Sequence, residues 1–204
     1  MRSASSVGSE NSKKALRESA LRTRRSLDQA VVKPLNERIQ RNLYSLNEFE
    51  RARVLACYVA TKDEVQTEGI IRTSLNLSKT ILVPLVDRTR TELLFSELRD
   101  FSELAEGHYG ILEPRIGFLR IAPLEKADIV LVPLVAWDER GFRIGHGKGY
   151  FDRALGSLKK DIPTIGLAFE AQRVERVPDE PFDVPLRFIV TEQRVLRFKG
   201  GEVR

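Results

Sequence analysis

After residue 53 the chain carries short runs of apolar, often β-branched residues that are continuous and do not alternate with polar ones. The runs are VLACYVA (54–60), TILVPLV (80–86), ADIVLVPLVAW (127–137), PTIGLAF (163–169) and RFIVT (187–191). Continuous apolar runs are typical of strands covered on both faces, as in a parallel sheet flanked by helices. Segments 64–75 and 150–158 are long enough for crossover helices. This order predicts an α/β fold, a three-layer sandwich around a mainly parallel, Rossmann-like sheet.

Two other regions complete the predicted architecture. Segment 91–98, TELLFSEL, follows a short charged turn and alternates more clearly, which predicts an antiparallel or edge strand. Residues 12–46 place apolar side chains mostly three and four positions apart, which is the spacing of an amphipathic helical region. Asp28 is suited to cap a helix and Pro34 follows it, so we expect two helices with a break at 26–28.

A chain of 204 residues is long enough to bury a core, and we expect a single α/β domain over 12–204. Residues 1–11 are rich in Ser, Gly and Asn, which predicts a disordered tail. No window approaches the ~20 apolar residues of a membrane helix, so we expect a cytoplasmic protein without a membrane partner. The single cysteine, Cys57, excludes a disulfide framework and a cysteine-based zinc cluster, and two histidines exclude a histidine-rich metal site.

Positive charge is concentrated at the start of the chain. Residues 1–41 hold ten Lys or Arg and four acids, a net charge of +6, whereas the remainder holds 24 bases and 25 acids. A basic segment on a balanced body fits a solvated helix surface, a polyphosphate ligand or nucleic acid. Because the sequence shows no aromatic and basic interleaving, zinc knuckle or recognition-helix pattern, we expect no nucleic-acid partner.

The segment RIGHGKGYFDR (143–153) follows a predicted buried strand and leads into a predicted helix. Its three glycines let the backbone approach a bulky anion and turn N–H groups toward it, while Arg143 and Lys148 supply positive charge. Asp152 falls in the first helical turn, where a carboxylate can hold a phosphate-bound magnesium ion. The segment matches neither the P-loop nor G-x-G-x-x-G. The alternative is a tight strand-to-helix connection without a ligand.

Five motifs follow one another along the chain. They are K-K-A-L-R (13–17), D-E-V-Q-T (63–67), Y-G-I-L-E-P (109–114), R-I-G-H-G-K-G-Y-F-D-R (143–153) preceded by V-P-L-V-A-W-D, and G-L-A-F-E-A-Q (166–172). Together they resemble, in the same order, the motifs of the 5-formyltetrahydrofolate cyclo-ligase family, also called methenyltetrahydrofolate synthetases. The resemblance covers nearly the whole chain from Lys13 onward.

The resemblance implies an enzyme that converts 5-formyltetrahydrofolate and ATP to 5,10-methenyltetrahydrofolate, ADP and phosphate, with Mg²⁺ as cofactor. In the family mechanism the formyl oxygen attacks the γ-phosphate to give an iminium phosphate, N10 closes the ring, and phosphate leaves. Phosphoryl transfer requires mostly positioning and positive charge from the protein. By the resemblance, Lys148 and Arg143 would act on the transferring phosphoryl group and Asp152 would ligate the metal.

The resemblance also implies two sets of binding residues. Those for the nucleotide are Lys13, Arg17, Arg143, Ile144, Gly145, His146, Gly147, Lys148, Gly149, Tyr150 and Phe151. Those for the folate are Val59, Glu64, Tyr109, His146, Gly147, Lys148, Gly149 and Tyr150. Some of these residues have structural alternatives, since Lys13 and Arg17 also suit a solvated helix face, Glu64 a helix N-cap and Tyr109 the core. Trp137 is predicted to be a core residue and Cys57 an inert one.

One position departs from the family pattern. Many relatives carry D-x-P-L-D before the last strand, and its second acid is associated with magnesium, whereas this chain has D-V-P-L-R and places Arg187 there. The reversed charge puts a second metal ligand in doubt. It leaves open the alternative of a non-catalytic folate or nucleotide binder with a buffering or regulatory role. In either case we expect a monomer whose partner is a small folate, with or without a polyglutamate tail.

Overall fold

The computed structural model describes residues 4–87, 89, 92–107, 110–158, 162–180 and 183–198, with the backbone alone for 4–11 and 29. The α-helices are α1 (Ala4–Arg25), α2 (Gln29–Tyr44), α3 (Asn47–Arg51), α4 (Glu68–Asn76) and α5 (Tyr150–Gly156). The 3-10 helices are η1 (Phe101–Glu103), η3 (Ile116–Phe118), η4 (Leu124–Lys126) and η5 (Glu170–Gln172). The strands are β1 (Val54–Cys57), β2 (Thr80–Asp87), β3 (Glu92–Leu98), β4 (Leu104–Glu106), β5 (Leu112–Pro114), β6 (Ile129–Val132), β7 (Ala136–Trp137), β8 (Arg143–Ile144), β9 (Thr164–Leu167), β10 (Phe188–Val190) and β11 (Val195–Arg197).

Within the described residues the main sheet has seven strands in the order β11-β10-β9-β6-β1-β2-β3. Strand β1 is parallel to both of its neighbours, β2 and β6. The pairs β6–β9 and β9–β10 are also parallel. The two outermost strands, β3 and β11, are antiparallel to their neighbours. The predicted parallel sheet is confirmed, and so is the antiparallel edge strand predicted at 91–98. Two short hairpins, β4–β5 and β7–β8, lie outside this sheet.

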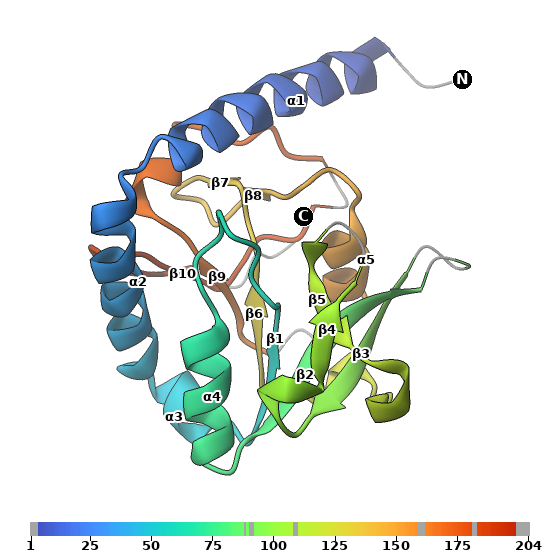
Figure 1. Ribbon diagram of the computed structural model, residues 1–204. Helices are drawn as coiled ribbons and strands as arrows, with labels where there is room; N and C mark the ends of the chain where they lie inside the picture. Colours follow the sequence, from blue (N-terminus) through green and yellow to red (C-terminus); the bar gives the residue numbers. More distant parts are fainter. Residues whose placement is uncertain are drawn as a thin grey trace.

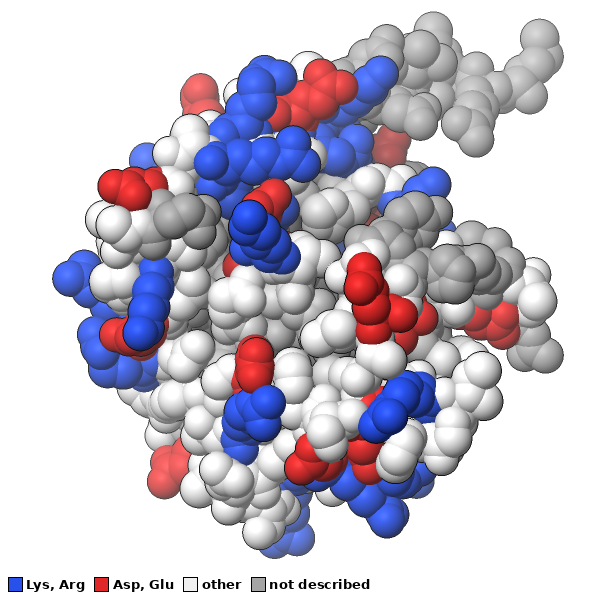
Figure 2. Space-filling view, viewed as in Figure 1, with Lys and Arg blue, Asp and Glu red and all other residues white. Residues whose placement is uncertain are grey.

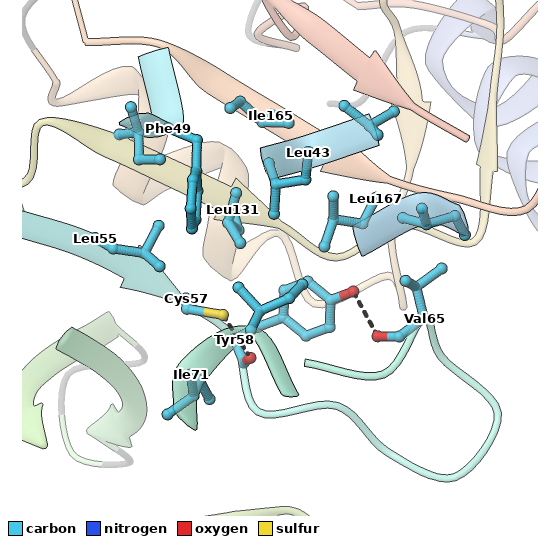
Figure 3. Close-up of a cluster of buried hydrophobic side chains, with 14 of the residues drawn as sticks. Leu43, Phe49, Leu55, Cys57, Tyr58, Val65, Ile71, Leu131, Ile165 and Leu167 are labelled. Carbon is cyan, nitrogen blue, oxygen red and sulfur yellow. Dashed lines mark hydrogen bonds between the residues drawn. The ribbon is translucent and has the colours of Figure 1, made fainter. Parts of the chain in front are cut away.

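Helices cover both faces of the sheet and make three layers (Figure 1). Leu55 and Cys57 of β1 point to the face that packs against α2, α3 and α4, whereas Ala56 points to the opposite face, which packs against α5. This alternation follows from the two-residue period of a strand. Figure 3 shows the first face, where Leu43 of α2 and Phe49 of α3 lie beside sheet residues. The continuous apolar runs therefore reflect burial on both sides, as predicted.

The N-terminal region forms two helices that meet at a break, as predicted. Asp28 is the N-cap of α2, and its side chain accepts a hydrogen bond from the backbone N–H of Ala30 at 2.9 Å. Helix α1 begins at Ala4, eight residues before the start of the predicted helical region at 12, and residues 1–3 lie outside the described part. Helix α1 crosses the end of the sheet above the β7–β8 hairpin (Figure 1).

The order of the strands defines where a ligand can bind. The chain continues from β1 to β2 on one side, and β6 pairs with the other side of β1. The direction of winding therefore reverses between β1 and β6, and in open α/β sheets the crevice beyond the carboxyl ends of such strands is the usual binding site. The loops that follow Cys57 and Val132 begin at this end of the sheet. Among the described residues, no helix combines the length and apolar character that a membrane crossing requires.

Candidate functional site

The glycine-rich segment is held by a buried carboxylate at its base. Asp138 is fully buried and accepts hydrogen bonds from the backbone N–H groups of Arg140 at 2.9 Å, Phe142 at 3.2 Å and Val177 at 2.9 Å. The Arg140 guanidinium pairs with the same carboxylate at 2.8 Å. These contacts fix the turn between β7 and β8, from which the segment 145–149 emerges before α5 begins.

Helix α1 lies against this segment through its basic face. Arg17 Nε donates to the carbonyl oxygen of Gly145 at 2.8 Å. Gly147 has a φ of 95°, a backbone conformation that disfavours any residue with a Cβ. The lysine and arginine side chains gather over α1 in Figure 2. The structure thus brings together the basic helix and the glycine-rich segment, as the sequence predicted.

Lys13, one turn before Arg17, contacts two acids near the other end of the chain. Its Nζ lies 2.5 Å from Asp183 Oδ2 and 3.2 Å from Glu180 Oε2. Burial lowers the pKa of Lys13, but the hydrogen bonds and charges of Asp183 and Glu180 prevail and raise it above its usual value. Lys13 is therefore a positive charge held in place beside the glycine-rich segment, and it is not a solvated helix base.

Arg143 and Asp152 form an ion pair across the start of α5. Arg143 Nη2 lies 2.6 Å from Asp152 Oδ1, and Nη1 donates to the carbonyl oxygen of Val184 at 2.8 Å. The Arg143 side chain is 3% exposed, and its burial lowers its pKa, which Asp152 and Asp183 oppose. Asp152 lies in the first turn of α5, as predicted, and Lys148 is exposed on the loop before it.

The acids near this loop suit a magnesium ion whose coordination is partly supplied by phosphate oxygens. Among the described residues no group of three His, Cys, Asp or Glu side chains could form a protein-only metal site. Mg²⁺ in phosphate-transfer sites needs only one or two carboxylates, because phosphate oxygens and water complete its coordination. Asp152, with a side chain 31% exposed, satisfies that requirement. Asp183 Oδ2 is already engaged by Lys13.

Glu64 connects the predicted folate residues to the glycine-rich segment. His146 Nε2 lies 3.0 Å from Glu64 Oε1. Glu64 Oε2 accepts hydrogen bonds from the backbone N–H of Thr61 at 2.8 Å and from its hydroxyl at 3.0 Å. Burial raises the pKa of Glu64, but the hydrogen bonds from His146 and Thr61 prevail and hold it below its usual value. A carboxylate kept ionised inside the crevice is suited to accept hydrogen bonds from a ligand.

Helix α4 starts three residues later than it would if Glu64 were its N-cap. The N-cap is Thr67, without a side-chain cap hydrogen bond, so the alternative that Glu64 is a helix cap is wrong. Thr67 instead donates its hydroxyl to the Tyr58 carbonyl at 2.8 Å. Tyr58 in turn donates its hydroxyl to the Val65 carbonyl at 2.9 Å (Figure 3). These bonds close the loop that carries Glu64 at the end of β1.

The other predicted site residues differ in what they can offer. Val59, Ile144 and Trp137 are buried in the core, and burial raises the pKa of the Cys57 thiol, so Cys57 is inert. Phe151 packs against the clusters on both faces of the sheet. For Ile144 and Phe151 this leaves the backbone as the means of contacting a ligand.

Two aromatic positions remain. Tyr150 is half-buried, with the Arg153 guanidinium 5.2 Å from its ring centre. The predicted folate contact of Tyr109 lies outside the described residues.

Arg187, which replaces the usual acid, lies at the start of β10. Its backbone N–H donates a hydrogen bond at 3.1 Å to the hydroxyl oxygen of Thr164, the first residue of β9. This is the amino end of the parallel strands, whereas Glu64 follows the carboxyl end of β1.

Sequence reasoning assigned no role to Glu180 or to Arg24, and it named Asp183 only as a substitute metal ligand, without its contact to Lys13. Arg24 is 5% exposed and donates to the Leu134 carbonyl, next to the glycine-rich segment's hairpin. The spacing of the bases in the sequence could have indicated Arg24, because Lys13, Arg17 and Arg24 fall on one face of a helix.

Comparisons with known proteins identify the family of the chain. A family profile described as the 5-formyltetrahydrofolate cyclo-ligase family matches residues 9–192. The 5-formyltetrahydrofolate cyclo-ligase of Haemophilus influenzae is 32% identical over 150 residues, 72% of this chain and 80% of the relative. That of Escherichia coli is 33% identical over 147 residues, 71% of this chain and 80% of the relative.

Solved structures show the same similarity. The NMR structure of Aquifex aeolicus 5,10-methenyltetrahydrofolate synthetase superposes with a TM-score of 0.81 at 33% identity, over 93% of this chain and 94% of that one. The 5,10-methenyltetrahydrofolate synthetase of Mycoplasma pneumoniae superposes with a TM-score of 0.72 at 26% identity, over 88% of this chain and 98% of that one. By its sequence, its fold and the arrangement of its motifs, the chain belongs to the 5-formyltetrahydrofolate cyclo-ligase family.

Proposed function

We propose that this protein converts 5-formyltetrahydrofolate to 5,10-methenyltetrahydrofolate and couples the reaction to the cleavage of ATP to ADP and phosphate. One observation carries the proposal: the 3.0 Å contact between His146 of the glycine-rich segment and Glu64 at the end of β1. The first segment has the chemistry of a phosphate site and the second that of a pterin site. Their contact supports a reaction in which a phosphoryl group passes between the two ligands.

The nucleotide side of the site is built from backbone and cations. Segment 145–149 would hold the triphosphate with its N–H groups, because the glycine conformation of Gly147 turns the chain there without a side chain in the way. Arg17 and Lys13 are fixed at this segment by their contacts with Gly145 and Asp183. Lys148 is exposed on the loop and free of burial, so its ammonium can move onto the transferring phosphoryl group.

The folate side is built around Glu64. Its ionised carboxylate would accept hydrogen bonds from the amino and ring N–H groups of the pterin and so orient the formyl oxygen toward the γ-phosphate. The oxygen attacks phosphorus and forms an iminium phosphate, while the bond to the β-phosphate oxygen breaks and ADP leaves. N10 then attacks the activated carbon and gives up its proton, and inorganic phosphate departs with the former formyl oxygen.

Asp152 would hold a magnesium ion, which neutralises charge on the phosphates when it is bound. Arg143 lies 2.6 Å from that carboxylate and orients it. Because Arg143 is buried and donates to Val184 as well, the carboxylate is fixed relative to the segment 183–187. We propose that Arg143 acts on the metal side of the site through Asp152.

The direct test mixes the purified protein with 5-formyltetrahydrofolate and Mg-ATP and follows both the absorbance of the methenyl product and the formation of ADP. Stoichiometric product and ADP would support the proposal. Binding of either ligand without product would favour the non-catalytic binder. Tight, steeply salt-dependent binding of RNA or DNA without turnover would overturn both ligand assignments in favour of a nucleic-acid module.

A further inference from the structure

Arg24, in the last turn of α1, is a buried cation whose hydrogen bonds are incomplete. Its side chain is 5% exposed, and Nη1 donates to the Leu134 carbonyl oxygen at 3.4 Å. Its Nε is buried, and no acceptor within the described part of the chain faces it. A buried donor on a charged group is costly to leave without an acceptor. This position therefore suits an oxygen atom that the chain itself does not supply.

The contacts of Arg24 place it at the carboxyl end of β6. Leu134 lies two residues after Val132, the last residue of β6, and Gln172 of η5 donates to the same carbonyl oxygen at 3.2 Å and to that of Val135 at 2.9 Å. Burial lowers the pKa of Arg24, and the charge that opposes this most strongly is that of Glu64. The next residue, Arg25, pairs with Asp63 at 3.3 Å, so the end of α1 lies near the loop that carries Glu64.

The geometry of α1 explains how one helix serves both halves of the site. Lys13, Arg17 and Arg24 are four and seven positions apart, so they share one face of the helix. Seven residues correspond to about 10 Å along the axis. Arg17 contacts the glycine-rich segment, and Arg24 lies about two helical turns further along the same face, toward the loop that carries Glu64.

The chemistry of the pyrimidine edge of a pterin matches this pair. That edge presents a carbonyl oxygen, a ring N–H and an amino group in a row, which are one acceptor and two donors. The two oxygens of Glu64 suit the two donors. We propose that Arg24 is a substrate-positioning residue whose Nε donates to the ring carbonyl oxygen beside them. This inference rests on the proposed function and adds a specificity contact to its folate side.

The first test measures binding of each ligand separately by calorimetry. Arg24→Met keeps the length of the side chain and removes its donors, so 5-formyltetrahydrofolate should bind about 10- to 100-fold more weakly while ATP affinity stays unchanged. Arg25→Met is the matched control, because Arg25 is 64% exposed and its guanidinium pairs with Asp63 at 3.3 Å on the surface. It should leave both affinities unchanged.

A purely structural role would produce a different pattern. If Arg24 serves only to balance buried charge or to hold α1, Arg24→Met should lower ATP and folate affinity together, because α1 also carries Lys13 and Arg17. It should also lower the midpoint of thermal unfolding. Either that joint loss or unchanged folate affinity in the folded variant would overturn the proposal.

The second test uses the analogue of the substrate in which an amino group replaces the ring carbonyl. The wild-type protein should prefer the carbonyl compound, and Arg24→Met should lose most of that preference, as in a double-mutant cycle. If Arg24→Met does not fold, Arg24→Lys takes its place, since it keeps the charge and displaces the donor. A preference that survives in a folded variant would contradict the assignment.

The two hypotheses fail in distinguishable ways. If the wild-type protein neither binds nor converts 5-formyltetrahydrofolate, the proposed function fails. If it binds and converts the substrate while the Arg24 variants retain full affinity and preference, only the assignment of Arg24 fails.

Discussion

A Cβ added at Gly147 would lie 3.2 Å from Cζ of Arg17, which is closer than nine in ten contacts that Cβ atoms make in real proteins. The glycine and the arginine are therefore fitted to each other, with the guanidinium against the backbone where a side chain would otherwise stand. Gly147→Ala should lower the unfolding free energy by about 1–2 kcal/mol, since its positive φ disfavours a Cβ, and should weaken ATP binding.

Gly145→Ala is the control for that change. A Cβ at Gly145 would meet no atom within 4 Å, and its φ is not in the left-handed region. Denaturant unfolding and ATP calorimetry on both variants check the expectation. Equal losses of stability in the two alanine variants would contradict the role of Gly147 backbone geometry.

Lys13→Met should raise the KM for ATP about 10- to 100-fold and leave folate affinity unchanged, because Lys13 is held at the glycine-rich segment by Asp183 and Glu180. Lys14→Met is the matched control, since Lys14 is the exposed neighbour on the same helix. Steady-state kinetics with each substrate varied in turn measures both effects. A similar rise in KM for both variants would show that only the overall charge of α1 matters.

Glu64→Gln should weaken 5-formyltetrahydrofolate binding about 10- to 100-fold, because the amide keeps the shape of the side chain but presents one donor in place of an acceptor. ATP affinity should stay within about twofold of wild type. Asp63→Asn changes the adjacent acid, which pairs with Arg25 on the surface, and should have little effect. Calorimetric titration of the folate into each variant distinguishes the two acids.

The free energy of unfolding should decrease at low pH, in part because Glu64 becomes protonated. Its pKa in the folded protein is held below its ordinary value of 4.5, so the unfolded state binds the proton more readily. The contribution of Glu64 is present above the ordinary pKa and is lost as the pH falls through the folded pKa. Urea unfolding from about pH 6 to about pH 3 should show a smaller decline for Glu64→Gln than for wild type. Parallel declines would contradict the shift.

Asp152→Asn should raise the Mg²⁺ concentration for half-maximal activity by about 10-fold or more, because the neutral amide is a poorer ligand for a hard cation. Asp179→Asn is a suitable control, since Asp179 is an acid of similar exposure that pairs with Arg140 at 2.8 Å. Activity as a function of free Mg²⁺ measures the effect. An unchanged requirement would remove Asp152 from the metal site.

The strands of the parallel sheet were predictable because they are buried on both faces and therefore read as continuous apolar runs. The hairpin β4–β5 and the strands β8 and β11 escaped prediction because each strand has only two or three residues, too few to establish a period. The run 127–137 predicts one strand, whereas the structure divides it into β6 and β7. Helix α1 extends back to Ala4 through a Ser- and Gly-containing sequence, and this sequence has no periodic apolar residues from which a helix could be predicted.

The candidate site was predictable where its residues are close in sequence, as in the segment 143–153. The partners of Lys13 were not, because Glu180 and Asp183 lie 167 and 170 positions away and the spacing of residues carries no information at that distance. Arg24 was one of ten bases in the first 41 residues, and burial alone separates it from the others.

The contact between Lys13 and Asp183 has a consequence for how the protein is made. Helix α1 is synthesised before the carboxylate that orients its lysine, because Asp183 lies 170 positions after Lys13. A nascent chain therefore carries the cationic helix without this partner while the intervening residues are made. The two segments can meet only after the residues between them exist, so we expect chains that stop before Asp183 to bind ATP weakly.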